Sequence, residues 1–291
     1  MGVAKADQGG RAALLTAQSR LDALSLVKAG HVFDLDHEIR IGAPHYPRLQ
    51  PPYLMSLWTS AERVIRNLRR QGVKNDPGVN LEQVHMTFHV GTHVDALGHF
   101  SIGDDMYGGR SAEEIVGDQG LRELGIEHAP SLITRGVCVD LAGLDGDDHL
   151  EAGRALGPDV LQAALDRDGI RLKTGDVVLI RTGWGRYFKK DPARYVGGEP
   201  GIDLEAARWL TSQGVCAIGA DTMAVEVLPG QDPEVVMPVH QHCLVEEGVY
   251  LIENLFLDEL SAAGVREFCF IMLPARFRGA TGSPVRPVAL I

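Results

Sequence analysis

The second half of the chain alternates between short apolar runs and stretches with helical spacing. Each apolar run has the length of a β-strand and is too evenly apolar to be an exposed edge strand. Because strands that are buried on both faces need helices to cover them, these runs predict a central, covered sheet. The clearest runs are GVCVDL (136–141), DVVLIRTGW (176–184), GVCAIGAD (214–221), VYLIENLFL (249–257) and EFCFIMLP (267–274).

Two stretches between these runs have the periodicity of helices. They are GPDVLQAALDRDG (157–169) and DLEAARWLTSQG (203–214). Asp203 is a suitable N-cap for the second stretch, and Gly214 suits the position just after its last turn. Strand-length runs that alternate with helices predict a mixed α/β fold.

The first half of the chain has a weaker pattern. Apolar residues at helical spacing over 11–28 predict a helix, and HVFDLDHEIRIG (31–42) alternates in the manner of a strand. Residues 43–56 are rich in proline and aromatic side chains, which indicates a loop near a cleft. Because no repeat or low-complexity linker is visible, we expect one domain over residues 31–291, preceded by a helical extension, residues 1–30.

Composition and charge exclude some classes of partner. The chain has 291 residues, 45% hydrophobic and 23% charged, with a net charge of −11. A phosphate backbone needs clustered Lys and Arg, so we expect no nucleic-acid partner and interpret the one basic stretch, RVIRNLRR (63–70), as a solvated helix face. No apolar run reaches the ~20 residues of a membrane helix, so we expect no membrane partner. The four cysteines lie far apart, which indicates free thiols in a reducing, cytoplasmic compartment.

Side chains that can bind a metal are concentrated in one short segment. In VHMTFHVGTHVDALGH (84–99) apolar residues alternate with polar ones up to Val90, which predicts a half-buried strand. Four polar residues of this segment stand at odd-numbered positions, so a β-like path would turn their side chains to the same face of the strand. Imidazole and carboxylate ligands suit Zn²⁺ or Mn²⁺, and the alternative is a solvated loop that is rich in histidine. The four residues are His89, His93, Asp95 and His99.

A straight strand cannot bring these side chains to one ion. At a rise of ~3.3 Å per residue, His89 and His93 would lie ~13 Å apart, whereas each imidazole on a shared ion needs a contact of ~2.1 Å. A helix would bring them together, but β-branched neighbours and Gly91 weaken a helix here. We therefore expect a bulged strand end or loop that bends at Gly91.

Two acidic residues in the second half are further candidates. Glu253 interrupts the apolar run 249–257, and burying an unpaired carboxylate is costly. It therefore binds a metal or acts in catalysis, forms a structural ion pair, or faces solvent. Asp221 ends the run 214–221, and open α/β sheets bind ligands at the carboxyl ends of their strands. Asp221 is thus either a substrate-binding residue or a turn and cap residue.

The histidine-rich segment resembles the signature of a known family. HVGTHVDALGHF (89–100) is similar to the His-x-Gly-Thr-His-x-Asp-x3-His signature of the cyclase family, which includes bacterial kynurenine formamidases and isatin hydrolases. Every defining position of the signature is filled. The resemblance covers about residues 31–291. Further similar segments are VFDLDHEIRIGAPHYP (32–47), TGDVVLIRTGWG (174–185), IGADTMAVEV (218–227), GVYLIENL (248–255) and TGSPVRPVAL (281–290).

This resemblance implies a fold and a first set of ligands. The fold is a compact βαβ-type, swivelling barrel-like domain, usually in a homodimer or larger oligomer such as a homotetramer. The residues matching His89, His93 and Asp95 are implied to bind a divalent metal, Mn²⁺ or Zn²⁺. The residue matching His99 is implied to act as an acid or base.

The resemblance also implies that a later histidine and a glutamate complete the site. Glu253 matches the glutamate, as a metal ligand and catalytic residue. The histidine is either His240 or His242, and counting back from LVEEG (244–248) favours His240. If neither histidine binds, the site holds one ion, in the manner of the manganese-dependent isatin hydrolases.

The implied reaction is hydrolysis of a small, planar substrate by a metal-activated water. The substrate is a cyclic amide such as isatin, or an arylformamide, and Trp58 and Trp184 are the candidates to hold its ring; Trp184 is otherwise a core or rim tryptophan. Leu97 stands where compact kynurenine formamidases tend to carry proline, which favours the isatin-hydrolase branch. The alternatives are lactone opening or dehydration at the same metal site, and a metal- or ligand-binding protein without turnover.

Overall fold

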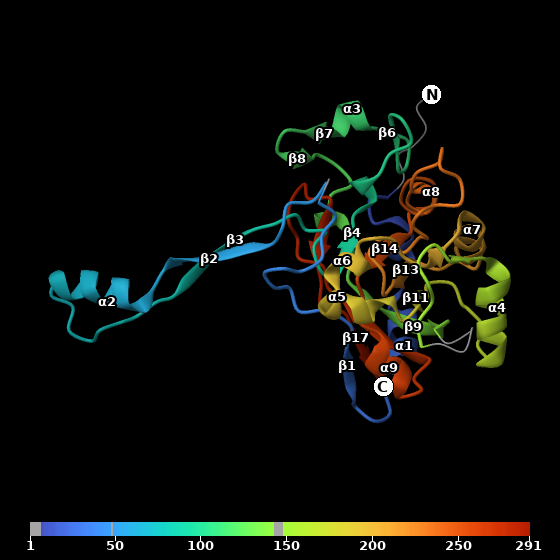
Figure 1. The fold of residues 1–291 in the computed structure, drawn as a ribbon, viewed down its shortest axis with the longest axis horizontal. Helices are drawn as coiled ribbons and strands as arrows, with labels where there is room; N and C mark the ends of the chain where they lie inside the picture. The colour runs from blue at the N-terminus through green and yellow to red at the C-terminus, as the bar shows by residue number, and fades with distance from the viewer. Residues whose placement is uncertain (1–6, 48, 143–147) are drawn as a thin grey trace.

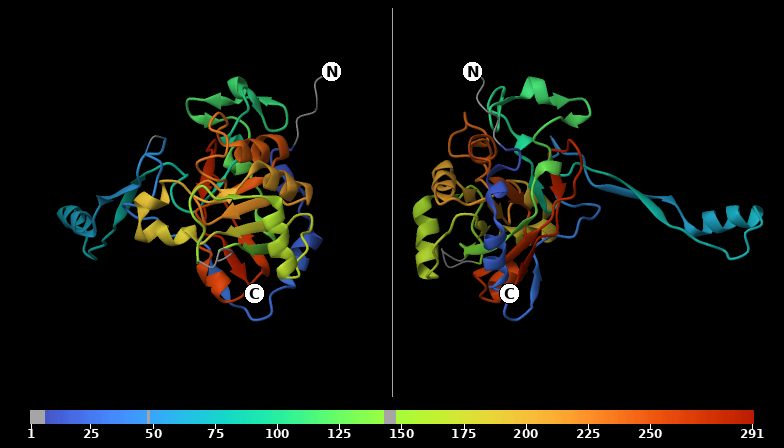
Figure 2. Two further views of the ribbon diagram at one scale, coloured as in Figure 1. Left: turned by 45° about the vertical axis from the view of Figure 1, so that its right-hand side comes forward. Right: turned by 180° about the vertical axis from the view of Figure 1, so that it is seen from behind.

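One curled sheet of nine strands forms the centre of the molecule in the computed structural model, which describes residues 7–47, 49–142 and 148–291 (Figures 1 and 2). Its central strands run parallel, and antiparallel strands extend it on both sides. In order across the sheet they are β1 (Val32–Asp34), β17 (Val288–Leu290), β15 (Glu267–Met272), β9 (Leu132–Asp140), β11 (Val177–Arg181), β13 (Ala217–Ala220), β14 (Tyr250–Glu253), β4 (His93–Asp95) and β16 (Gly282–Pro284).

The predicted mixed α/β fold is confirmed. Each of the five apolar runs in the second half overlaps one strand of this sheet, and the residues of β13 and β14 are all buried. The four parallel strands β9, β11, β13 and β14 are apolar throughout most of their length because helices and loops cover them. Their carboxyl ends meet at one edge of the sheet, where the polar residues of the candidate site begin.

Helices cover the sheet and form its crossovers. Helices α4 and α7 contact each other and lie side by side along one flank (Figure 1). The Asp203 side chain accepts the backbone amide of Ala206 as the N-cap of α7, and Gly214 follows its end with a φ of 84°. The helices of more than one turn are α1 (Ala17–Leu24), α2 (Ala61–Arg70), α4 (Pro158–Arg167), α7 (Leu204–Ser212) and α9 (Asp258–Ala262), and the shorter ones are α3 (Ala112–Ile115), α5 (Tyr187–Lys190), α6 (Pro192–Tyr195) and α8 (Pro238–His240).

The N-terminal segment packs against the sheet. Helix α1 begins with a capping box between Thr16 and Ser19, and it contacts β9 and β15. Residues 1–6 of the predicted extension lie outside the described residues, and the boundary at residue 30 stays a prediction. Within the described residues, no helix has both the length and the apolarity to cross a membrane.

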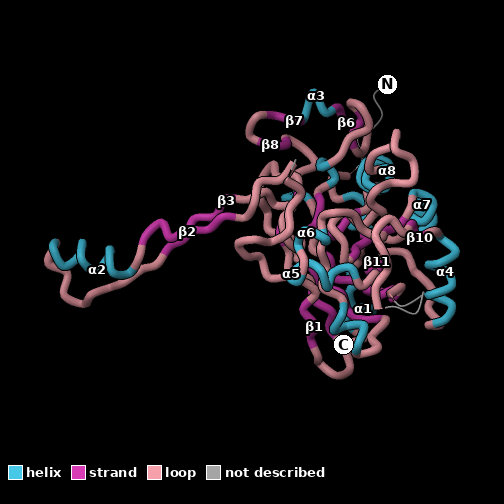
Figure 3. The backbone as a smooth tube through the Cα atoms, in the orientation of Figure 1, coloured by secondary structure: helices cyan, strands magenta, loops and turns pink. Residues whose placement is uncertain are grey.

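A long hairpin projects from the body, and we call residues 54–85 the arm (Figures 1 and 3). Strands β2 (Leu54–Thr59) and β3 (Leu81–His85) pair antiparallel, and α2 lies at the tip. The basic stretch is an exposed face of α2, as predicted. The other two-stranded sheets are β5 (Asp105–Met106) with β6 (Arg110–Ser111), β7 (Val116–Gly117) with β8 (Gly120–Leu121), and β10 (Ala155–Leu156) with β12 (Gly201–Ile202).

Three local predictions for the first half are wrong in their extent. The strand predicted up to Val90 ends at His85, because its partner β2 lies in the arm and the chain must leave that pair to enter the central sheet at His93. Of the strand predicted over 31–42, only β1 forms, since β17 offers it just three partners. The predicted loop over 43–56 ends where β2 begins, at Leu54.

Candidate metal centre and active site

Two neighbouring strands carry the centre of the candidate site. Strand β4 pairs antiparallel with β14, and His93 stands directly opposite Glu253 in this register. Asp95 lies two residues after His93, so the pleat sends both side chains to the same face. All three residues of β4 are buried, and Glu253 is 6% exposed. Three side chains that prefer water are thereby held together inside the protein.

The predicted bend at Gly91 is present and orients His93. Gly91 has a φ of 73°, and a Cβ at this position would lie 2.7 Å from Cγ1 of Ile39, so only glycine fits the turn. The Gly91 carbonyl accepts the Nδ1–H of His93 at 2.8 Å. The other ring nitrogen, Nε2, therefore faces Glu253 Oε2 at 3.1 Å and Asp95 Oδ1 at 3.4 Å. The bend brings the ring centroids of His89 and His93 to 4.9 Å.

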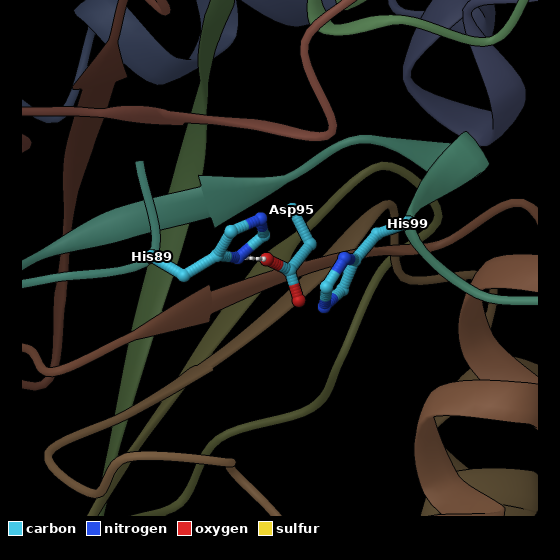
Figure 4. Close-up of side chains that lie close together, drawn as sticks. All are labelled: His89, Asp95 and His99. Atoms are coloured by element: carbon cyan, nitrogen blue, oxygen red, sulfur yellow. Dashed lines mark ion pairs between the residues drawn. The ribbon is translucent and has the colours of Figure 1, made fainter. Parts of the chain in front are cut away.

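His89, from the loop before β4, and His99, from the 3₁₀ turn Leu97–His99, both lie beside Asp95 (Figure 4). Nδ1 of His89 lies 2.9 Å from Asp95 Oδ1, and its Nε2 lies 2.9 Å from the Thr281 hydroxyl. The rings of His89 and His99 stack with centroids 4.1 Å apart. Strand β16 passes close behind, since a Cβ on Gly282 would lie 2.9 Å from the His89 ring. Asp95 is thus shared by histidines from two directions.

The structure brings His240, and not His242, to this cluster. His240 Nε2 lies 3.1 Å from Glu253 Oε1 and 3.6 Å from Asp95 Oδ2. His242 instead pairs with Glu246 at 2.7 Å and with the Thr211 hydroxyl at 2.9 Å. His240 ends α8, and His242 lies in the π-helical segment that follows (Gln241–Glu247), so the two side chains have different partners. This geometry favours His240, and its role as a metal ligand stays a prediction.

Burial and charge act in opposite directions on these groups. Burial would lower the pKa of His93, but the nearby carboxylates of Asp95 and Glu253 raise it to about 10. For His240, burial is likewise outweighed by Glu226 and Glu253, which raise its pKa to about 10. Burial would raise the pKa of Asp95, yet the surrounding histidines lower it well below its usual range. The carboxylates are therefore ionised and demand positive charge beside them.

His99 differs from the other histidines of the cluster. Burial lowers its pKa to about 4, and the attraction of Asp95 only partly opposes that effect. The ring is therefore neutral near pH 7 and can accept a proton.

The donor atoms fit a divalent metal ion. Within the described part of the chain, Nε2 of His93 and both carboxylate oxygens of Asp95 are buried without a hydrogen bond of normal geometry, although histidine nitrogens lie within ion-pair distance of Asp95. Buried polar atoms in proteins rarely lack a hydrogen bond, and a bound metal ion would explain why these three atoms lack one. Imidazole nitrogens and carboxylate oxygens suit Zn²⁺ or Mn²⁺. Two overlapping groups of ligand atoms lie within 4.8 Å of one another: His89, Asp95 and His99, and His93, Asp95 and Glu253.

The three residues predicted to contact substrate lie elsewhere. Trp58 is 67% exposed on β2 of the arm. Trp184 is 1% exposed in a small core cluster, where its indole N–H donates to the Tyr195 carbonyl, so it has no surface to offer a ring. The buried Asp221 carboxylate accepts three hydrogen bonds from Thr182 and Gly183 and thus holds the turn after β11. These surroundings fit a core role for Trp184 and a turn role for Asp221, and the predicted substrate contacts stay predictions.

Three other residues at the site were missed by sequence reasoning. Glu226 accepts the Nδ1–H of His240 at 2.6 Å. Asn254 accepts the Tyr195 hydroxyl, and its amide lies 3.5 Å from Nδ1 of His93. The half-buried Phe100 ring lies with its centroid 4.8 Å from that of His240. Asn254 and Phe100 each directly follow a predicted residue, and Glu226 lies within the family-like segment 218–227, but none of the three was singled out from the sequence.

Comparisons with known proteins agree with this geometry. The Cyclase family model, described as "Putative cyclase", matches residues 33–227. A kynurenine formamidase from Geobacillus thermodenitrificans is 29% identical over 208 residues, which make up 72% of this chain and 78% of that protein. A kynurenine formamidase from Bacillus cytotoxicus is 26% identical over 216 residues, 72% of this chain and 79% of that protein.

Solved structures extend the likeness over nearly the whole chain. A crystal structure described as a novel cyclase superposes with a TM-score of 0.86 and 27% identity, covering 98% of this chain and 96% of that one. An isatin hydrolase bound to the product analogue thioisatinate superposes with a TM-score of 0.67 over 95% of this chain and 99% of that one; at 21% identity this likeness shows the fold alone. Because the family model matches more than half of its residues, the chain belongs to the cyclase family.

Proposed function

We propose that this protein is a metal-dependent hydrolase that opens a cyclic amide or cleaves an arylformamide. The observation that carries the proposal is the buried, hydrogen-bond-deficient Asp95 carboxylate, with His93 and Glu253 on one side and His89 and His99 on another. The names of the relatives support the same chemistry, since kynurenine formamidases and isatin hydrolases both act on C–N bonds outside peptides. The substrate is accordingly a small molecule.

Four residues form the proposed metal site around Asp95. His93 and Glu253 would hold the ion from the paired strands, His89 from the loop before β4, and His240 from α8. A divalent ion, Mn²⁺ or Zn²⁺, would supply an acidified water and polarise the carbonyl of the substrate.

His99 is the proposed acid and base. Its ring stacks on His89, and it belongs to the 3₁₀ turn Leu97–His99 and not to the β4–β14 pair. The neutral ring takes one proton from the attacking water and returns it to the leaving nitrogen, which departs as an amine. In a cyclic amide the amine stays tethered to the new carboxylate, and the ring opens.

Phe100 is the proposed contact for the planar part of the substrate. Its ring packs against His99, with centroids 5.2 Å apart, and against His240. It is half-buried, whereas Trp184 is sealed in the core and Trp58 lies on the arm. An aromatic ring beside the acid–base residue offers an offset stack to an aryl group.

A substrate panel measured together with metal content tests the proposal. We expect isatin or N-formylkynurenine to be hydrolysed with Mn²⁺ or Zn²⁺ present, followed by ultraviolet absorbance. His93→Ala should lose both bound metal and activity. Turnover of lactones or dehydration of hydroxy acids, with neither amide cleaved, would contradict the proposed reaction. Full metal occupancy in His93→Ala, measured by elemental analysis, would contradict the proposed ligand set.

A further inference from the structure

We propose that residues 8–15 act as a clasp that positions two residues of the candidate site, His99 and His240. The clasp consists of the 3₁₀ helix Gly10–Leu14 and the residues that flank it. It lies outside residues 33–227, the part of the chain that the family model matches. Its role in catalysis rests on the proposed function, whereas its effect on the order of the site can be measured without any substrate.

Arg11 ties the clasp to the end of the segment that follows His240. Its backbone N–H donates to the Gly248 carbonyl at 2.8 Å, and its Nε–H donates to the Glu247 carbonyl at 3.1 Å. Its guanidinium also pairs with the Glu247 carboxylate and donates to the Thr211 carbonyl in α7. Glu247 is the last residue of the π-helical segment that begins directly after His240. One side chain therefore holds the far end of that segment against α7.

Gly10 brings the clasp into contact with the turn that carries His99. It has a φ of 56°, and a Cβ at this position would lie 2.8 Å from Cδ1 of Leu97 and 2.4 Å from the Gly248 carbonyl oxygen. Glycine is required here because the clasp passes too close to both elements for a side chain. Leu97 is buried and begins the 3₁₀ turn that ends at His99. The clasp therefore packs directly on the turn of the proposed acid–base residue.

Gln8 reaches the same turn through Leu124. The side-chain carbonyl of Gln8 accepts the backbone N–H of Leu124 at 2.8 Å, and the Leu124 carbonyl accepts the backbone N–H of Gly98 at 3.0 Å. Leu124 has a φ of 62°, a conformation that a leucine keeps only where its surroundings hold it. The bond from Gln8 therefore stabilises a strained residue that is itself bonded to the turn.

These contacts matter because neither His99 nor His240 lies on a strand of the central sheet. Backbone pairing fixes the strand ligands, whereas these two rings depend on the packing of a short turn and a short helix. Their ring centroids are 6.3 Å apart, and Gln241 donates to the Ser101 carbonyl at 3.3 Å between the two elements. Because the clasp packs on both elements at once, it stabilises the spacing of the two rings. Misplacement of such groups by ~1 Å costs on the order of 100-fold in rate.

Hydrogen exchange of the full chain, followed by mass spectrometry, tests the clasp without a substrate. In Gly10→Ala the new methyl group collides with both elements, so we expect the backbone amides of residues 96–101 and 241–249 to exchange at least ~10-fold faster than in the wild type. Gly30→Ala is the matched control. Gly30 has a φ of 69° and open space around it, so this variant carries a similar backbone strain without a collision and should keep the wild-type exchange rates at those residues.

Arg11→Gln tests the clasp through metal binding and turnover. This variant removes the guanidinium and its ion pair, and it should lower metal affinity ~10-fold in competition with a chelating dye. At saturating metal it should lower kcat at least ~10-fold. Arg266→Gln is the matched control, because the Arg266 side chain is also 25% exposed and pairs with Asp140 and Asp168. It should lose a comparable Tm and keep both metal affinity and kcat.

The outcomes separate the clasp from the proposed reaction. Wild-type exchange rates at residues 96–101 and 241–249 in both clasp variants, together with wild-type metal affinity in Arg11→Gln, would overturn the clasp even if amides are cleaved. If the wild type cleaves no amide, the proposed function fails, and exchange and metal affinity still decide the clasp. If Gly10→Ala does not fold, Arg11→Gln supplies both measurements, because its side chain is only partly buried.

Discussion

Glu226→Gln is the sharpest test of how the protein holds its candidate metal ligands. Oε1 of Glu226 accepts two hydrogen bonds from His240, from the backbone N–H at 3.0 Å and from Nδ1–H at 2.6 Å. Oε2 accepts the Val239 backbone N–H at 3.2 Å. Glutamine has one acceptor oxygen instead of two, so its amide group must point a donor at an N–H whichever way it turns.

The size of the effect follows from this geometry. Glutamine keeps the two bonds from His240 if its amide oxygen faces that residue. Its NH₂ group then faces the Val239 backbone N–H, and this unsatisfied pair of donors costs ~1–3 kcal/mol of stability. The Nδ1–H bond also changes from a carboxylate acceptor to a weaker neutral one. Loss of such a carboxylate behind a metal-binding histidine lowers metal affinity ~10–100-fold, or ~1.4–2.7 kcal/mol.

Glu199→Gln is the matched control. Glu199 is also fully buried, and its carboxylate accepts the backbone N–H groups of Met223 and Ala224 at 2.6 and 2.7 Å, with no bond to a histidine. Both variants should lose stability, but only Glu226→Gln should lose metal affinity, measured by competition with a chelating dye. Equal metal affinity in Glu226→Gln and wild type, or an equal loss in Glu199→Gln, would refute the assigned positioning role.

Three other predictions follow from the site. His99→Ala should keep its metal and lose at least ~100-fold in kcat; loss of the metal would make His99 a ligand instead. Gly91→Ala should lower the free energy of unfolding by ~1–3 kcal/mol, whereas Gly42→Ala, with a φ of 85° and open space around it, should cost less. In the metal-free protein, the raised pKa values of His93 and His240 mean that protonation of both rings stabilises the folded state. This stabilisation is complete below pH ~6.5 and is lost as the pH rises toward about 10. Its Tm should therefore fall between pH 7 and 10, and a saturating ion, which binds neutral imidazole, should remove that fall.

The central strands could be predicted because a strand that is buried on both faces is recognisable from its own residues. Each buried parallel strand is a run of apolar residues, whatever its neighbours in the sheet are, so 176–184 and 249–257 could be found without knowing their pairing. The strand order could not be found in this way. Strand β4 has three residues and pairs with β14 across more than 150 positions of sequence, and no local pattern encodes that register.

The same distinction applies to the site. The spacing of His89, His93 and Asp95 is local, and the need for a bend at Gly91 follows from strand geometry alone. The choice of His240 over His242 depends on the direction of a helical turn in three dimensions. The exposure of Trp58 and the burial of Trp184 depend on the arm and on a small core cluster, and a tryptophan in the sequence looks alike in both settings.

The division of the candidate ligands between strands and loops has a mechanical consequence. His93, Asp95 and Glu253 stand on β4 and β14, whose backbone pairing fixes their spacing before any ion binds. His89, His99 and His240 come from a loop, a short 3₁₀ turn (Leu97–His99) and the end of a short helix. Ligands on paired strands define where an ion lies, because a small error in their positions lowers affinity sharply. His99, the one of these three that is not a proposed ligand, should therefore alter turnover more than metal content when it is changed, whereas variants of the strand ligands should alter both.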